Sequence, residues 1–185
     1  MTQPDLQQIR SAVAQDPKNA ELRYLLGAEL AQQREYEAAV AEMSTALALD
    51  PQLHVARFQL GLLYLTMAQP DRAMGTWAAL EALDDKAALK TFKRGLEALI
   101  RDEFAPCLAL LRQGILLNTQ NAPLNRDMNM IIEKISEALA ATQAPKAASA
   151  AAPAELAPAP APKPAAPAPV RTDFSLYGDP RDTKH

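Results

Sequence analysis

The sequence has few of the residues that build catalytic and metal sites. Among its 185 residues are one cysteine, two histidines and six glycines. A lone cysteine, Cys107, excludes a disulfide framework within the chain, and His54 and His185 form no cluster with the spacing of metal ligands. None of the glycines forms a loop of the kind that cradles phosphate groups. We therefore expect no enzymatic activity, no cofactor and no metal.

Features that direct a chain to a membrane or to nucleic acid are missing as well. No apolar run approaches the length of a membrane span, and the N-terminal segment lacks the basic patch and apolar stretch of a secretory signal. The net charge of −3 gives no attraction for polyphosphate. We expect a cytoplasmic protein that neither inserts into a membrane nor binds nucleic acid.

The sequence does contain a pattern of residues that repeats at a fixed spacing. Gly27, Gly61 and Gly95 follow one another at a constant step, and an aromatic residue stands three positions before each glycine. These aromatic residues are Tyr24, Phe58 and Phe92. A shared 34-residue step is typical of stacked helical hairpins and not of an enzyme with a single core. The function of such a stack lies in what its surface binds.

The first unit, residues 20–53, has a leucine–glycine pair, an aromatic residue at the turn, two small residues and an aspartate–proline exit. These residues are Leu26, Gly27, Tyr36, Ala39, Ala46, Asp50 and Pro51. The pattern resembles the tetratricopeptide repeat, and the units at 54–87 and 88–121 keep part of it. The resemblance implies an all-α fold in which antiparallel helix hairpins form a right-handed superhelix. Small residues let the two helices of a hairpin approach closely, and the proline ends the second helix.

Single helices are expected to flank the three units. Residues 4–16 show the apolar spacing of a helix, and residues 122–141 carry an apolar stripe from Met128 to Leu139. Half-units of this kind cover the bare ends of a repeat stack. We therefore predict one helical domain over residues 1–141.

The composition changes at residue 142. From position 144 to position 169, half of the residues are alanine and nearly a third are proline, so residues 142–169 are predicted to form a disordered linker. Apolar and turn-forming residues return in the segment 170–185. They are Phe174, Leu176, Tyr177, Gly178 and Pro180. This segment is either a frayed terminus or, in the interpretation we prefer, a tethered recognition motif.

In the family that the repeats resemble, the first helix of each hairpin lines the concave face of the superhelix. The residues that map to its inward positions form a largely apolar ladder. They are Tyr24, Ala28, Phe58, Leu62, Leu65, Phe92, Leu96, Leu99, Arg126 and Met130. We predict that this ladder is a groove for an amphipathic helix or for an extended peptide with apolar anchors. The alternative is that, in so short an array, some of these residues belong to the core.

These features favour a non-enzymatic adaptor or scaffold, whose groove holds one protein or peptide partner and whose tail holds a second. Lys93 and Arg126 are too few for the basic clamp with which some members of that family hold a terminal carboxylate. The alternative is a chaperone similar to the helical-repeat chaperones of bacterial secretion systems, which shield an apolar segment of a client. The tail favours the adaptor, and the linker is typical in style of bacterial proteins. Docking of the tail on its own or a neighbour's groove leaves self-association open.

Overall fold

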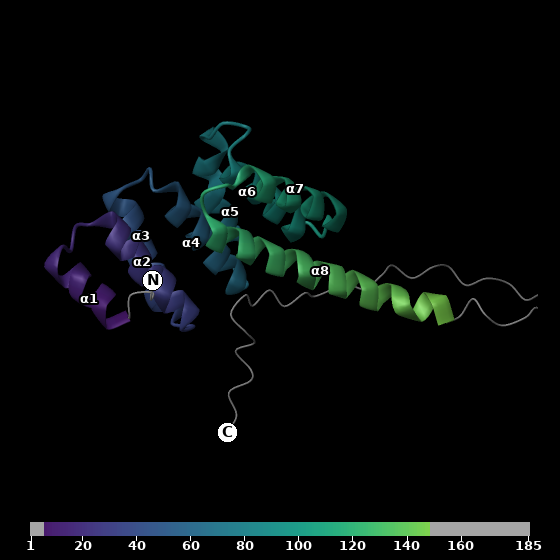
Figure 1. Ribbon diagram of the computed structural model, residues 1–185, viewed down its shortest axis with the longest axis horizontal. Coiled ribbons are helices and arrows are strands. Elements are labelled where there is room, and N and C mark those ends of the chain that lie inside the picture. The colour runs from purple at the N-terminus through teal and green to yellow at the C-terminus, as the bar shows by residue number, and fades with distance from the viewer. Residues whose placement is uncertain (1–5, 149–185) are drawn as a thin grey trace, which may run out of the picture.

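The described part of the chain is a stack of helices (Figure 1). The computed structural model describes residues 6–148. Within these residues it contains helices and no strand, which confirms the all-α prediction. The elements are α1 (Leu6–Gln15), α2 (Ala20–Gln32), α3 (Tyr36–Leu49), α4 (His54–Thr66), α5 (Pro70–Trp77), the 3-10 helix η1 (Ala78–Ala82), α6 (Ala88–Ile100), α7 (Phe104–Leu117) and α8 (Ala122–Ala148). The predicted motif at 170–185 and the linker from residue 149 onward lie outside the described residues.

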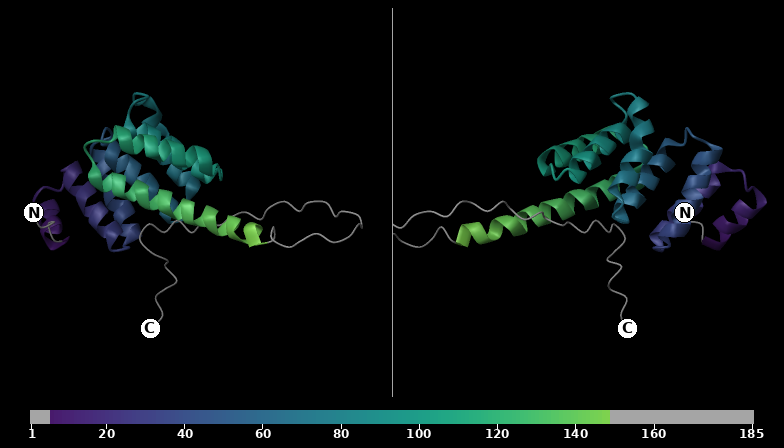
Figure 2. Two further views of the ribbon diagram at one scale, coloured as in Figure 1. Left: turned by 45° about the vertical axis from the view of Figure 1, so that its right-hand side comes forward. Right: turned by 180° about the vertical axis from the view of Figure 1, so that it is seen from behind.

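Each predicted repeat is one helix hairpin. α2 packs against α3, α4 against α5 and α6 against α7, while α1 packs on α2 and α8 on α7. Neighbouring first helices also touch, since α4 contacts both α2 and α6. Figure 2 shows the same order of hairpins from two further sides. The arrangement is the solenoid that the glycine period predicts.

The turn inside each hairpin repeats one backbone geometry. Arg34, Ala68 and Asp102 have φ angles of 64°, 56° and 58° and occupy the same position of successive repeats. In each turn, the amide of the next residue donates to the carbonyl five residues back, at 2.9 Å. A left-handed residue of this kind ends a helix and satisfies its last carbonyl groups. None of the three is the glycine that this conformation favours, so the sequence does not reveal the turn.

The repeated glycines let the second helix of a hairpin lie directly on the first. A Cβ atom on Gly61 would overlap the indole of Trp77, and one on Gly27 would come 2.7 Å from Cγ of Met43. Trp77 occupies the space over Gly61 and donates its indole N–H to the carbonyl oxygen of Phe58 at 2.9 Å. The glycine period therefore marks the contact between paired helices.

The last helix is longer than predicted. The composition predicted an end at residue 141 and a linker from residue 142, but α8 continues to Ala148. Alanine has the highest helix propensity, and the alanine-rich run after residue 137 extends the helix through Pro145. Figures 1 and 2 show the N-terminal half of α8 beside the hairpins and its C-terminal half extending beyond them.

Candidate functional site

The predicted ladder is buried at its centre. Five of its ten residues expose at most 4% of their surface: Phe58, Leu62, Phe92, Leu96 and Leu99. The ring of Phe58 stacks on that of Trp77 with centroids 5.9 Å apart, and it lies 6.0 Å from the ring of Phe92. The first contact joins the two helices of the second hairpin, and the second joins this hairpin to the next. The structure therefore places these five residues in the core and not on the open concave face that the repeat pattern predicted.

The third repeat shows how an aromatic residue of the ladder becomes core. Gly114 of α7 stands where the first repeat has Ala46, and a Cβ atom on Gly114 would overlap the ring of Phe92. The glycine thus makes room for the ring between α6 and α7. The first repeat keeps Ala46, and its Tyr24 is only half-buried.

The ends of the ladder remain at the surface. Five predicted residues have half-buried or exposed side chains: Tyr24, Ala28, Leu65, Arg126 and Met130. Met130 is 39% exposed, and Leu25, which the repeat pattern did not select, is 45% exposed beside Tyr24. The first and last of the ladder helices, α2 and α8, therefore carry most of the ladder that a partner can reach.

A polar contact joins two of the ladder helices, α4 and α8, and its charge acts on a residue of a third, α2. The side-chain amide of Gln59, on α4, donates to the carboxylate of Asp127, on α8, at 3.5 Å. Burial raises the pKa of the Tyr24 phenol, on α2, and the nearby negative charge of Asp127 raises it further. We call Tyr24, Leu25, Gln59, Asp127 and Met130 the inner surface.

Asp127 is half-buried, and no lysine or arginine of the described residues forms an ion pair with it. Burial raises the pKa of its carboxyl group, and the hydrogen bond from Gln59 and the charge of Arg126 offset only part of that rise. This carboxylate is therefore partly desolvated and is compensated only in part by the charge of Arg126. Its single hydrogen bond within the described residues leaves it able to accept others.

Gln59 and Asp127 were not predicted as site residues, although the sequence contains a signal for them. Leu25, Gln59, Lys93 and Asp127 follow the same period as the glycines, each one position after a member of the ladder. This second series changes from apolar to polar along the stack. Its three polar residues, Gln59, Lys93 and Asp127, form hydrogen bonds or ion pairs with other side chains, and an apolar periodicity does not reveal them.

Lys93, one of the two basic residues considered for a carboxylate clamp, is already engaged. Its ammonium group is buried, 2.7 Å from the carboxylate of Glu81 and 3.1 Å from that of Glu97. Arg94 reaches Glu81 at 2.7 Å, and Lys90 lies 3.5 Å from it. Hydrogen bonds from Lys93 and Arg94 lower the pKa of Glu81 to about 2. These ion pairs connect η1 to α6, so the ammonium group of Lys93 is already paired within the protein.

Other sites in the described residues offer little chemistry. Residues 6–148 contain no group of three or more metal-ligating side chains suited to an ion, and no helix among them is long and apolar enough to cross a membrane. Cys107 is fully buried, and burial raises the pKa of its thiol to about 11, so the thiolate that would react is scarce at neutral pH.

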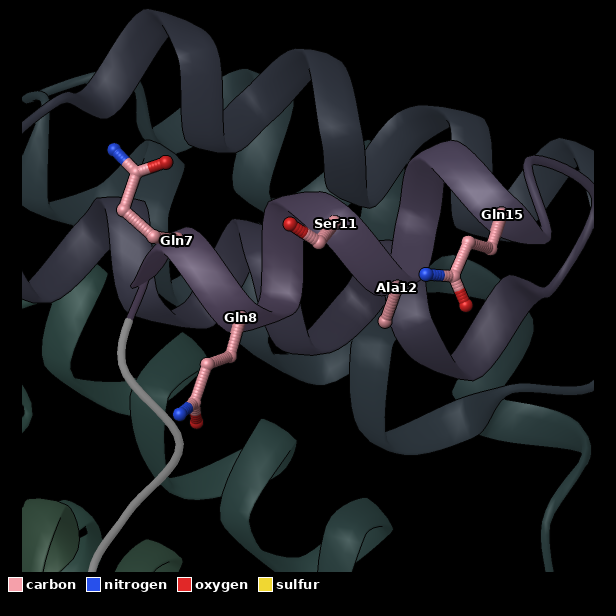
Figure 3. A pocket seen from close by; sticks show the side chains of 5 residues that line it. All are labelled: Gln7, Gln8, Ser11, Ala12 and Gln15. Atoms are coloured by element: carbon pink, nitrogen blue, oxygen red, sulfur yellow. The ribbon is translucent and has the colours of Figure 1, made fainter.

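A shallow hollow runs along α1 and is lined by Gln7, Gln8, Ser11, Ala12 and Gln15 (Figure 3). Its lining comes from one helix and is mostly polar, as expected for the capping end of a stack.

Comparison with known proteins identifies the type of repeat. Residues 1–50, which include α1, α2 and α3, match the family model described as tetratricopeptide repeat. Helices α4 to α7 continue the same hairpin with the same turn geometry at the same step. No curated protein matches the chain.

Proposed function

We propose that this chain, a member of the tetratricopeptide repeat family, is a non-enzymatic adaptor that binds a segment of a partner protein on its inner surface. Repeats of this family mediate contacts between proteins. The observation that carries the proposal is that Leu25 and Met130 stay exposed on α2 and α8, the helices that also carry Tyr24 and Asp127. Leu25 is 45% exposed and Met130 is 39% exposed, whereas the middle of the ladder is core.

The inner surface suits a short segment. Its apolar part consists of Leu25, Met130 and the exposed part of Tyr24, with Ala28 and Leu65 half-buried on the ladder helices. A helix or an extended peptide with one or two apolar anchors matches this area, since such ligands place a few side chains at fixed spacing. Affinity then depends on those few anchors and on the polar pair Gln59 and Asp127.

The segment 170–185 supplies the second half of the adaptor proposal. Phe174, Leu176 and Tyr177 offer apolar anchors and follow an alanine and proline linker, and the support for this role comes from the sequence alone. A tethered motif gains from a high effective concentration near the stack, so even a weak interaction contributes. The chaperone alternative requires a continuous apolar groove. The burial of Phe58 and Phe92 leaves less apolar surface for a client, which favours the adaptor.

Site-specific photo-crosslinking in the native host tests the proposal. A p-benzoylphenylalanine residue is placed at Leu25 or at Met130 in the full chain, and, as a matched control, at Gln113, which is exposed on the second helix of the third hairpin. We expect the same crosslinked protein from position 25 and from position 130. We expect no crosslink to that protein from position 113.

Two results would count against this assignment. Crosslinks from position 113 alone would place the binding face on the second helices. A crosslinked band of twice the chain's mass from Leu25 and Met130 would show that the inner surface joins two copies of this protein, and the adaptor role would have to be abandoned for self-association.

A further inference from the structure

The state of Asp127 points to the chemistry of the partner. Its carboxylate is half-buried, its one hydrogen bond within the described residues is to the Gln59 amide at 3.5 Å, and no basic side chain of those residues forms an ion pair with it. A distance of 3.5 Å is long for an N–H···O hydrogen bond. The carboxylate therefore keeps most of its capacity to accept hydrogen bonds.

The groups around Asp127 complement a cation with a hydrocarbon stem. Tyr24, on α2, is close enough for the charge of Asp127 to raise the pKa of its phenol. Met130 follows Asp127 by three residues, on the same face of α8, and is 39% exposed. Lysine and arginine side chains place their methylene groups on apolar surface and their charge at a polar group, and both interact favourably with aromatic faces.

We propose that the inner surface receives a basic side chain of the partner, arginine or lysine, with its charged group at Asp127 and its methylene stem against Tyr24 and Met130. This inference rests on the proposed function and adds the chemical class of the bound residue. It is the reverse of a carboxylate clamp, since the receiving group is acidic and the incoming one is basic.

Other ligands fit this surface less well. An anionic residue would be repelled by Asp127, and a purely apolar anchor would desolvate the carboxylate further without giving it a partner. Arg126 is exposed and next to Asp127 in the sequence, so the surface as a whole is not strongly acidic. Recognition must therefore come from direct contact with Asp127 and not from long-range attraction.

The test is a selection of peptides on the full chain. Binders are taken from a library of short random peptides, and those that lose binding to the Asp127→Asn chain are retained. The carboxamide oxygen that this substitution introduces can still accept the hydrogen bond from Gln59, so the change removes the charge with little change of shape. The matched control is Glu37→Gln, a change of the same kind at an exposed position on α3, a second helix.

We expect the retained peptides to share an arginine or lysine at one position and to bind the Glu37→Gln chain normally. Replacing that arginine by citrulline, or that lysine by norleucine, should weaken binding to the wild-type chain about tenfold or more. The same replacement should not weaken further the residual binding to the Asp127→Asn chain, measured at high chain concentration, because the charge it would meet is gone. Retained peptides without a shared basic residue, or no peptide that depends on Asp127, would overturn the inference.

The outcome also separates this inference from the proposed function. If positions 25 and 130 crosslink to a partner but the selected peptides need no basic residue, the proposed binding face stands. Only the inference of a bound arginine or lysine then fails. If deletion of residues 149–185 shifts the NMR signals of Tyr24 and Gln59, the basic group comes from the chain's own tail, which would also overturn the proposal of an external partner.

Discussion

Replacing Phe58 by alanine should destabilise the whole stack, because this ring lies at the centre of the core. Phe58 is fully buried, stacks on Trp77 and packs against Phe92. Removal of a buried phenylalanine costs about 3–5 kcal/mol, and each aromatic pair adds about 0.5–1.5 kcal/mol beyond the buried area. With two such pairs lost, we expect a loss near the upper end of that range, about 4–5 kcal/mol. The loss is a large part of the roughly 5–15 kcal/mol that stabilises a typical domain.

The assay is urea unfolding followed by circular dichroism at the helical band, with Leu25→Ala as the matched control. Leu25 is 45% exposed, so its truncation should change the free energy of unfolding by no more than about 0.5 kcal/mol. A Phe58→Ala variant that loses less than about 1 kcal/mol would show that the ring contributes little to the core. The distinction between a buried ladder and the inner surface would then fail.

Three further predictions concern the turns, the ion network and the cysteine. Ala68→Gly should raise the free energy of unfolding by about 1 kcal/mol in urea titrations, because residue 68 has a positive φ that glycine adopts without strain. Glu81 has a pKa lowered from 4.5 to about 2, so its contribution to the stability of the fold is complete above pH 4.5 and declines as the pH falls toward 2. The variant Glu81→Gln should therefore show a flatter pH dependence of the melting temperature between pH 2 and pH 4.5. Cys107 should react with a thiol reagent at pH 8 only after urea has unfolded the chain, and fast reaction of the native protein would contradict its burial.

The helical hairpins could be predicted from the sequence because their cause is local. Gly27 and Gly61 recur where paired helices touch, and apolar residues recur at helical spacing beside them. The turns at Arg34, Ala68 and Asp102 could not be predicted, since their left-handed conformation is imposed by the helix-ending hydrogen bonds and not by a glycine. The extension of α8 to Ala148 is not evident from the sequence, because Pro145 favours a helix end whereas the alanines around it favour a helix.

The candidate site was predicted only in part, for a reason of geometry. A sequence period tells which residues of the first helices share a face, but it does not tell how closely successive helices approach. Phe58 and Phe92 are therefore core, whereas Tyr24 and Met130, at the two ends of the same ladder, stay accessible. Asp127 lies one position beside the ladder, and only the packing of α8 brings it to Gln59.

The most direct measurement compares stability and partner binding in one variant, Asp127→Asn. Burial disfavours the ionised carboxylate, so above its pKa the folded state carries a cost that asparagine removes. We predict that the variant has an equal or higher free energy of unfolding at pH 7, while the partner crosslink from position 25 drops about tenfold or more. A variant that is less stable than the wild type and still gives the full crosslink would show that Asp127 holds the helices together and takes no part in binding.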